Sequence, residues 1–429
     1  MRVVIVGGSF GGVQAAVEIK REAPEKEVLV IEKQTELGFV PGSLALILQG
    51  KAASVDELRW ITRAELEAQG IHVRTGVSCT GLLPDHQIQL STGEAIGFDR
   101  LVIATGSRQS FHQEEVPSAR IKTCKTEQDV TDILTQLEEL ETVAIVGGGH
   151  VGLELADAFA QTDKQIHLFE SDTMLMGHYF DEEMILPLET AIRQSAVHLH
   201  MGTFVESMEE TSEGHVRLFF EETDLAVDLV VLANSTRPDN HIWQALDRND
   251  DGTLKVNAYL QTSDPNIYAI GDTIKVRFQL TGEEFYVSLV TNALRTASIA
   301  SQNILGTPEE DPGTVRVSGN QWFGYFVGSA GLLEKEALLY PEEIQIAQVD
   351  VPVAAVSKEK IKLKVIWDAE TEVLLGVQLV SKWMDFALLD LFALAIQQQQ
   401  TIHGFQVKER FFHPAFRAPL LGFSGLGEK

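Results

Sequence analysis

Two glycine-rich turns, at residues 7–12 and 147–152, contain the candidate functional residues of this sequence. Glycines at such a turn let the backbone approach a pyrophosphate, which the N–H groups at a helix N-terminus stabilise. An acidic residue follows at the end of the next apolar run, Glu32 after the first turn and Glu170 after the second. A carboxylate there accepts hydrogen bonds from a ribose diol. Two such turns, each with its acid, predict two bound dinucleotides.

The strands and helices around these turns occur twice along the chain. In each unit an apolar strand leads into the turn, a helix and a second strand follow, and a later apolar strand closes the unit. These segments are 3–6, 12–22, 28–32 and 101–104 in the first unit, and 143–146, 152–161, 165–170 and 228–233 in the second. The repeat predicts an α/β fold with two Rossmann-like domains, each with a buried parallel sheet.

The composition limits the class of protein. A chain of 429 residues is too long for one core, and 44% hydrophobic with 22% charged residues is typical of a globular protein. The formal net charge of −28 disfavours binding to nucleic acid or to an anionic membrane. We find no apolar stretch long enough to span a membrane, no signal peptide, and two cysteines that make no disulfide framework. We therefore expect a cytoplasmic protein without a membrane span.

Further segments share their pattern with one known family. They are 48–62, 269–272 with its Gly-Asp ending, 288–293, 374–379 and 411–416. Together with the two glycine turns, they resemble the FAD-dependent pyridine nucleotide-disulfide oxidoreductases, and within them the NADH peroxidase and NADH oxidase branch. The resemblance covers essentially the whole chain.

The resemblance implies a homodimer whose protomer holds FAD and NAD(H). It implies a FAD-binding domain in two parts, residues 1–114 and 241–312, with an NAD(H)-binding domain at residues 115–240 inserted between them. Residues 313–429 would form a C-terminal α+β dimerisation domain.

The resemblance also assigns residues to the cofactors. For FAD they are Gly7, Gly8, Ser9, Phe10, Gly11, Gly12, Glu32, Lys33, Val77, Ala104, Thr105, Gly106, Asp272, Leu289, Val290 and Thr291. For NAD(H) they are Gly147, Gly149, His150, Val151, Gly152, Glu170 and Ser235. No arginine cluster follows Glu170, which favours NADH, because the acid would repel a 2′-phosphate. Ser235 replaces a family glycine and could weaken NADH binding, and we expect His150 to face solvent over the pyrophosphate.

The sequence departs from the family where the chemistry is expected. Gly42 occupies the position of the redox cysteine, and Phe10 replaces the histidine of the first turn. Peroxide reduction by the family's route needs a thiolate that cycles through a sulfenic acid. We expect Cys79 and Cys124 to be ordinary structural residues, so a cysteine-based peroxidase is improbable. Pro41, Gly42 and Phe10 would then shape an acceptor pocket or plug the vacated space.

Three other residues are candidates for catalysis. Glu154 corresponds to a family acid near the nicotinamide, and it either pairs with Lys51 or forms part of a solvated helix face. His413, in a His-Pro pair, is either an acid/base group supplied by the partner subunit or a packed interface residue. No histidines have metal-ligand spacing, so no metal site is expected.

The leading functional prediction is a flavin-only NADH oxidoreductase. Its electrons would pass to oxygen, giving hydrogen peroxide, or to a small quinone-like acceptor. One alternative is a water-forming oxidase with an unrecognised second centre. Another is a non-catalytic NADH/FAD-binding redox sensor or scaffold, which turnover would distinguish from an enzyme.

Overall fold

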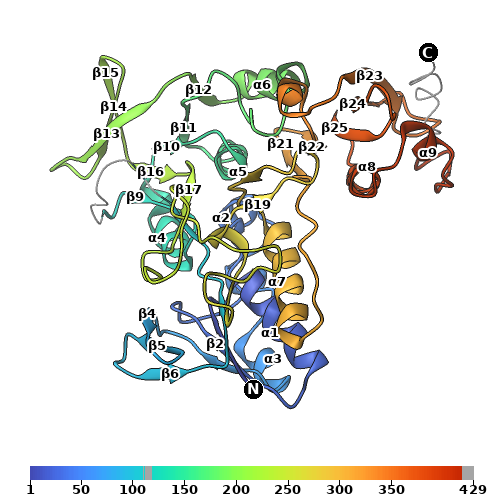
Figure 1. The fold of residues 1–429 in the computed structure, drawn as a ribbon. Helices are drawn as coiled ribbons and strands as arrows, with labels where there is room; N and C mark the ends of the chain where they lie inside the picture. The colour runs from blue at the N-terminus through green and yellow to red at the C-terminus, as the bar shows by residue number, and fades with distance from the viewer. Residues whose placement is uncertain (110, 112–117, 418–429) are drawn as a thin grey trace.

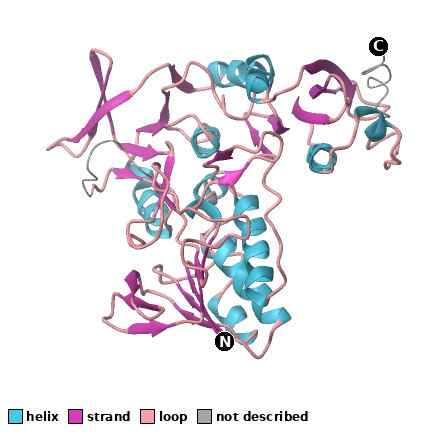
Figure 2. Ribbon diagram, in the orientation of Figure 1, coloured by secondary structure: helices cyan, strands magenta, loops and turns pink. Residues whose placement is uncertain are grey.

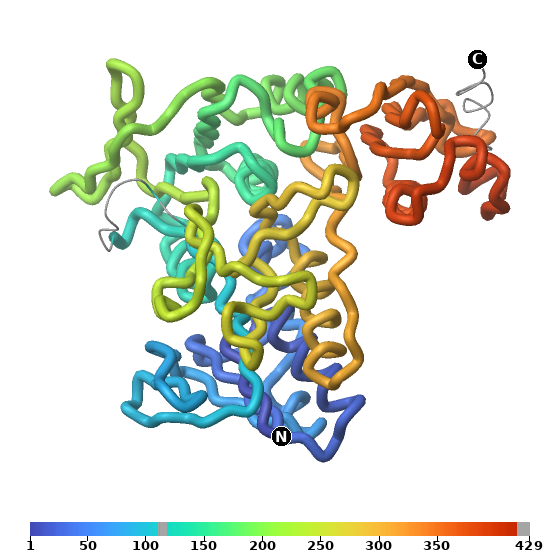
Figure 3. The backbone as a smooth tube through the Cα atoms, viewed as in Figure 1, coloured from blue at the N-terminus to red at the C-terminus, as the bar shows by residue number. Residues whose placement is uncertain are grey.

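The computed structural model describes residues 1–109, 111 and 118–417 (Figure 1). The first unit contains a parallel sheet in the order β18-β7-β1-β2-β3. Its strands are β1 (Arg2–Val6), β2 (Glu27–Ile31), β3 (His72–Arg74), β7 (Arg100–Ile103) and β18 (Ile267–Ala269). The central strand β1 is apolar and buried, as expected for a strand covered on both faces. Strand β18 comes from beyond the second unit, so the chain returns to complete this sheet (Figure 3).

Helices α1 (Phe10–Glu22) and α7 (Val290–Leu305) lie side by side on this sheet (Figure 2). Ser298 of α7 donates to Glu18 of α1 at 2.7 Å. Gly306 ends α7 with a φ of 90°, the left-handed conformation that glycine adopts without strain. The short helices α2 (Ser43–Leu48) and α3 (Arg63–Ala68) follow strand β2 in the chain.

The second unit repeats this plan with a parallel sheet in the order β12-β11-β10-β16-β9. Its strands are β9 (Ile121–Lys122), β10 (Thr142–Val146), β11 (Gln165–Glu170), β12 (Val197–Met201) and β16 (Leu229–Leu232), and its helices are α4 (Glu127–Gln136), α5 (His150–Phe159) and α6 (Glu182–Gln194). The predicted duplicated α/β fold is confirmed. Helices α1 and α5 each begin two residues before their predicted start, because the last residues of each glycine turn already have helical geometry.

Antiparallel segments complete the two units. The larger ones are β4 (Cys79–Leu83), β5 (Gln87–Leu90) and β6 (Ala95–Gly97) in the first, and β13 (Val205–Glu210), β14 (Val216–Phe220) and β15 (Thr223–Val227) in the second. The two connections between the units pair as β8 (Ser107–Gln109) and β17 (Thr236–Pro238), and β19 (Val276–Arg277) pairs with β20 (Glu284–Phe285). The predicted boundary at residues 114 and 115 lies outside the described residues, and the domain limits stay predictions.

The C-terminal part forms an antiparallel sheet in the order β21-β22-β25-β24-β23. Its strands are β21 (Ser318–Trp322), β22 (Tyr325–Gly331), β23 (Ile344–Pro352), β24 (Lys360–Asp368) and β25 (Leu374–Ser381), and its helices are α8 (Phe386–Gln397) and α9 (Ile402–Gln406). No helix in the described part of the chain is long and apolar enough to cross a membrane.

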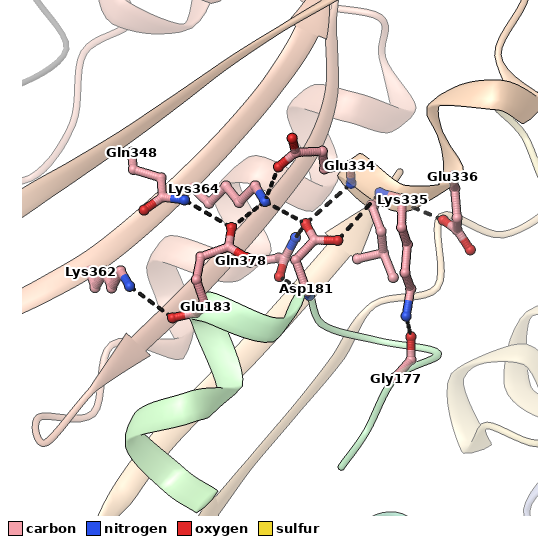
Figure 4. A network of polar contacts seen from close by, with 11 residues as sticks. Gly177, Asp181, Glu183, Glu334, Lys335, Glu336, Gln348, Lys362, Lys364 and Gln378 are labelled. Carbon is pink, nitrogen blue, oxygen red and sulfur yellow. Dashed lines mark hydrogen bonds and ion pairs between the residues drawn. The ribbon is translucent and has the colours of Figure 1, made fainter. Parts of the chain in front are cut away.

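A charge network joins the second unit to this C-terminal sheet (Figure 4). The fully buried Lys364 ammonium on β24 lies 2.8 Å from Asp181 Oδ2 and 2.5 Å from Glu334 Oε2, and it also contacts the Glu183 carboxylate. Gln378 of β25 donates to Asp181 Oδ2 at 2.5 Å. Burial opposes the charge of Lys364, but its three acidic partners raise its pKa above the usual value. The three carboxylates have the spacing of a cation site, and Lys364 supplies the cation.

Candidate functional site

The two glycine turns have matching geometry at the carboxyl ends of β1 and β10. Glu32 Oε2 accepts a hydrogen bond from the Gly8 N–H at 2.6 Å, and Glu170 Oε2 accepts one from the Gly148 N–H at 2.8 Å. The other carboxylate oxygen of Glu32, Oε1, accepts a hydrogen bond from the Gln34 N–H at 2.8 Å. Each predicted ribose-binding acid is therefore held beside its own turn by backbone donors.

Glycine is required at the tightest points of both turns. A Cβ on Gly12 would lie 1.9 Å from the Gly7 carbonyl oxygen, and one on Gly152 would lie 1.8 Å from the Gly147 carbonyl oxygen. By contrast, a Cβ on Gly149 would meet nothing within 4 Å. The turns therefore have a closely packed inner side and an open outer side, at the start of a helix whose first N–H groups are free to bind an anion. These residues fit a pyrophosphate in each unit.

Residues predicted to bind the rest of FAD gather at the same end of the first sheet. The Ala104 N–H donates to the Val6 carbonyl at 2.8 Å, and the Val77 N–H donates to the Glu32 carbonyl at 3.1 Å. Thr105 Oγ1 donates to the Asp239 carbonyl at 3.1 Å, and Lys33 forms a 3.5 Å ion pair with the Asp239 carboxylate.

Asp272 is the centre of a polar cluster that sequence reasoning only partly found. Ser107 Oγ donates to Asp272 Oδ2 at 2.6 Å, Ser288 Oγ donates to the same oxygen, and Lys125 Nζ donates to Ser107 Oγ at 2.5 Å. Burial lowers the pKa of Lys125, although the Asp272 charge opposes this effect. The N-terminal residues of α7, including Val290 and Thr291, follow immediately after Ser288 and Leu289 in the chain. The cluster joins the predicted ribityl-binding acid to a buried cation.

The loop that follows β16 contains Ser235 and lies beside the second glycine turn. A Cβ on Gly147 would lie 2.7 Å from the Asn234 backbone nitrogen, so the loop after β16 passes against the second glycine turn. Ser235, next in this loop, is exposed. A side chain at position 235 therefore lies beside the turn and not within the core of the unit.

Gly42, which takes the place of the family cysteine, faces an acid. A Cβ on Gly42 would lie 3.4 Å from both carboxylate oxygens of Glu154, which is carried by α5. Burial raises the pKa of Glu154 to about 7, with Lys51 opposing the shift and Asp157 adding to it. No ion pair joins Lys51 to Glu154 among the residues that the structure describes. Lys51 is exposed and lines a pocket of about 280 Å³ that Asp157 also lines.

Phe10, which takes the place of the family histidine, is stacked on an indole ring. The Phe10 and Trp60 ring centroids are 4.9 Å apart, with an angle of 8° between the planes. The Trp60 backbone N–H donates to the Gly38 carbonyl at 3.3 Å, which ties the Trp60 backbone to the segment that leads to Gly42. The two rings form an apolar surface next to the first turn, and no sequence pattern predicted Trp60 as the partner of Phe10.

The expectation that His150 faces solvent is wrong. His150 is half-buried and lies 2.8 Å from Ser318 Oγ of the C-terminal sheet, and its ring lies edge-on to Tyr179. Burial lowers its pKa to about 4. His150 therefore packs the second glycine turn against the C-terminal part as a neutral imidazole, whereas its neighbour Val151 is exposed.

The remaining candidates are His413 and the two cysteines. His413 is exposed, accepts a hydrogen bond from the Ala415 N–H at 3.2 Å and stacks on Phe416. These contacts all lie within the C-terminal segment. Cys79 and Cys124 are buried free thiols, and burial raises the pKa of each. Neither is an activated nucleophile.

The sheets and matched turns define a class of α/β proteins with two dinucleotide-type units. A family model described as pyridine nucleotide-disulphide oxidoreductase matches residues 1–297. A second model, described as the dimerisation domain of that family, matches residues 321–420. The chain therefore belongs to the pyridine nucleotide-disulphide oxidoreductase family.

Relatives of similar length are similar to this chain from end to end. An NADH oxidase of Enterococcus faecalis is 26% identical over 431 residues, which cover 98% of this chain and 97% of the relative. A solved pyridine nucleotide-disulfide family oxidoreductase from Enterococcus faecalis is 30% identical with a TM-score of 0.86, covering 99% of this chain and 98% of that one. A water-forming NADH oxidase from Lactobacillus brevis bound to NADH is 25% identical with a TM-score of 0.91, covering 100% of this chain and 97% of that one.

Proposed function

We propose that this protein is a FAD-dependent NADH oxidoreductase that works without a redox-active cysteine. The observation that carries the proposal is the combination of two intact glycine turns, each with its acid, and a glycine at position 42. FAD, when bound, accepts two electrons from NADH and passes them to a second acceptor. That acceptor is oxygen, giving hydrogen peroxide, or a small quinone-like molecule. The names of the relatives, among them NADH oxidases, support oxygen as the acceptor.

Each part of the fold has a binding role in this proposal. The residues assigned above from 7 to 12 hold the FAD pyrophosphate, and Glu32 and Asp272 hold its ribose and ribityl hydroxyls. The turn at 147–152 and Glu170 hold NADH. Glu170 and the nearby Asp172 place negative charge where NADPH would bring its 2′-phosphate, which supports NADH as the substrate.

We also propose a cytoplasmic homodimer, with domains at residues 1–114, 115–240, 241–312 and 313–429. The dimerisation domain that matches residues 321–420 supports this assembly. Three phenylalanines of its last described segment are largely exposed, Phe411 at 64%, Phe412 at 56% and Phe416 at 68%. Apolar side chains gathered in this way are typical of a protein interface. His413 would then lie at the interface.

Removing both cysteines tests the proposal that no thiol takes part in NADH oxidation. The double variant Cys79→Ala/Cys124→Ala should keep NADH oxidation within about twofold of the parent protein, since neither buried thiol is an activated nucleophile. The measurement is NADH consumption by the FAD-loaded protein in air, with the FAD content and thermal midpoint as checks on folding. A folded, FAD-loaded double variant that no longer oxidises NADH would contradict the proposal.

A further inference from the structure

We propose that the Glu154 carboxyl group, which faces the space of the missing cysteine side chain, supplies the proton that oxygen reduction consumes, with Asp157 linking it to solvent. This inference rests on the proposed NADH oxidase function. It adds a proton donor to a site whose sulfur chemistry is absent.

The backbone does not require glycine at position 42. Gly42 has a φ of −94° and a ψ of 4°, which other residues adopt readily. A Cβ there would be in ordinary contact with Glu154, at 3.4 Å from both oxygens. The Glu154 carboxylate therefore faces the space that a side chain at position 42 would enter.

The surroundings of Glu154 suit a carboxyl group that gains and loses a proton near neutral pH. Helix α2 presents buried Leu44 and Ala45 in the apolar cluster to which α5 contributes, and it carries no charged residue. The charged and titratable groups that interact with Glu154 are Lys51 after α2, Asp157 on α5 and the Cys124 thiol before α4. In the described chain no donor forms a hydrogen bond to the Glu154 carboxylate. Burial, which raises its pKa to about 7, is therefore opposed by the charge of Lys51 and by no hydrogen bond.

A polar pocket lies beside Asp157, close to this acid. Asp157 lies one helical turn after Glu154 on α5, so the two side chains share a helix face. Asp157 accepts hydrogen bonds from the Phe323 N–H at 3.0 Å and from Gln49 Nε2 at 3.4 Å. The pocket of about 280 Å³ beside it is lined by Gln49, Lys51, Asp157, Gln161, Gln321 and Gly324. Because Lys51 and Gln321 are exposed, a proton taken from Glu154 can be replaced from solvent along this route.

The proton balance of the reaction requires such a group. Reduction of oxygen to hydrogen peroxide takes two electrons and two protons. Oxidation of NADH to NAD⁺ releases two electrons and one proton. The second proton must come from elsewhere, and we assign it to the O–H of Glu154, which breaks as the new O–H bond of peroxide forms. The Glu154 carboxylate then regains a proton from water through the pocket beside Asp157.

The test compares Glu154→Gln with the parent holoenzyme and with Glu139→Gln, an exposed acid outside the site. The first readout is the visible spectrum of the oxidised, FAD-loaded protein as the pH is raised. The parent protein and Glu139→Gln should show a spectral transition near the Glu154 pKa of about 7, and Glu154→Gln should not. The second readout is oxygen turnover, which should fall about 100-fold in Glu154→Gln, a typical effect of losing a general acid.

The outcomes separate this inference from the proposed function. A parent protein whose flavin is not reduced by NADH would overturn the proposed function, and this inference with it. A parent protein that turns over normally, while Glu154→Gln keeps both the spectral transition and full turnover, would overturn the inference alone. If Glu154→Gln does not fold, the pH dependence of the parent protein tests the inference instead. A flavin spectrum and a turnover rate that do not change between about pH 5 and about pH 9 would contradict a titrating acid at the site.

Discussion

Replacing Gly152 with alanine is expected to abolish NADH binding while FAD binding is retained. The added Cβ would lie 1.8 Å from the Gly147 carbonyl oxygen, so the turn must open and its N–H groups lose their alignment. We expect the affinity for NADH to fall at least about 100-fold, which corresponds to about 2.7 kcal/mol. The measurement is the dissociation constant for NADH, read from anaerobic reduction of the bound flavin at rising NADH concentration.

The neighbouring Gly149 offers a matched comparison. A Cβ at Gly149 would meet nothing within 4 Å, so Gly149→Ala should keep the fold and the thermal midpoint of the parent protein. If Gly152→Ala binds NADH as tightly as the parent protein does, the turn at 147–152 does not hold the pyrophosphate.

Replacing Lys364 with methionine is expected to destabilise the protein by about 3 kcal/mol, at the lower end of the range for breaking a buried ion pair. The substitution keeps the length of the side chain but leaves Asp181, Glu183 and Glu334 without their shared cation. We place the loss at the lower end because Glu183 and Glu334 are partly exposed, and water screens them. The measurement is the free energy of unfolding in denaturant at neutral pH.

The pH dependence supplies a second check on the same cluster. Uncompensated carboxylates in the folded variant take up protons more readily than in the unfolded chain. The loss of stability should therefore shrink as the pH falls from about pH 8 to about pH 5. Lys362→Met is the control, because Lys362 contacts only the Glu183 backbone carbonyl in this network. Equal and pH-independent losses in the two variants would contradict a special role for Lys364.

The sequence predicted the parts of this protein that depend on local patterns. Glycines at 7 and 147 and the acids at 32 and 170 lie close to their partners in sequence, so strand, turn and helix signals located both turns. The helices α1 and α5 were predicted two residues short at their starts, because the last residues of each glycine-rich turn are already helical.

The contacts that the sequence could not predict join distant segments. Lys125 and Ser107 reach Asp272 only because the connection between the units folds back over the first sheet. His150 looked like a surface residue because its partner Ser318 belongs to another part of the chain. The approach of Glu154 to Gly42 depends in the same way on α5 packing against α2. Residue type and local spacing do not predict contacts between segments that lie far apart in the sequence.

The measurement that tests the central claim most directly is an anaerobic titration of the FAD-loaded protein with NADH, followed by admission of air and an assay for hydrogen peroxide. We expect NADH to bleach the yellow flavin absorbance. We also expect air to restore this absorbance, with one molecule of hydrogen peroxide formed for each NADH consumed. Flavin absorbance that stays unchanged under excess NADH would contradict the account, and so would oxygen consumption without peroxide.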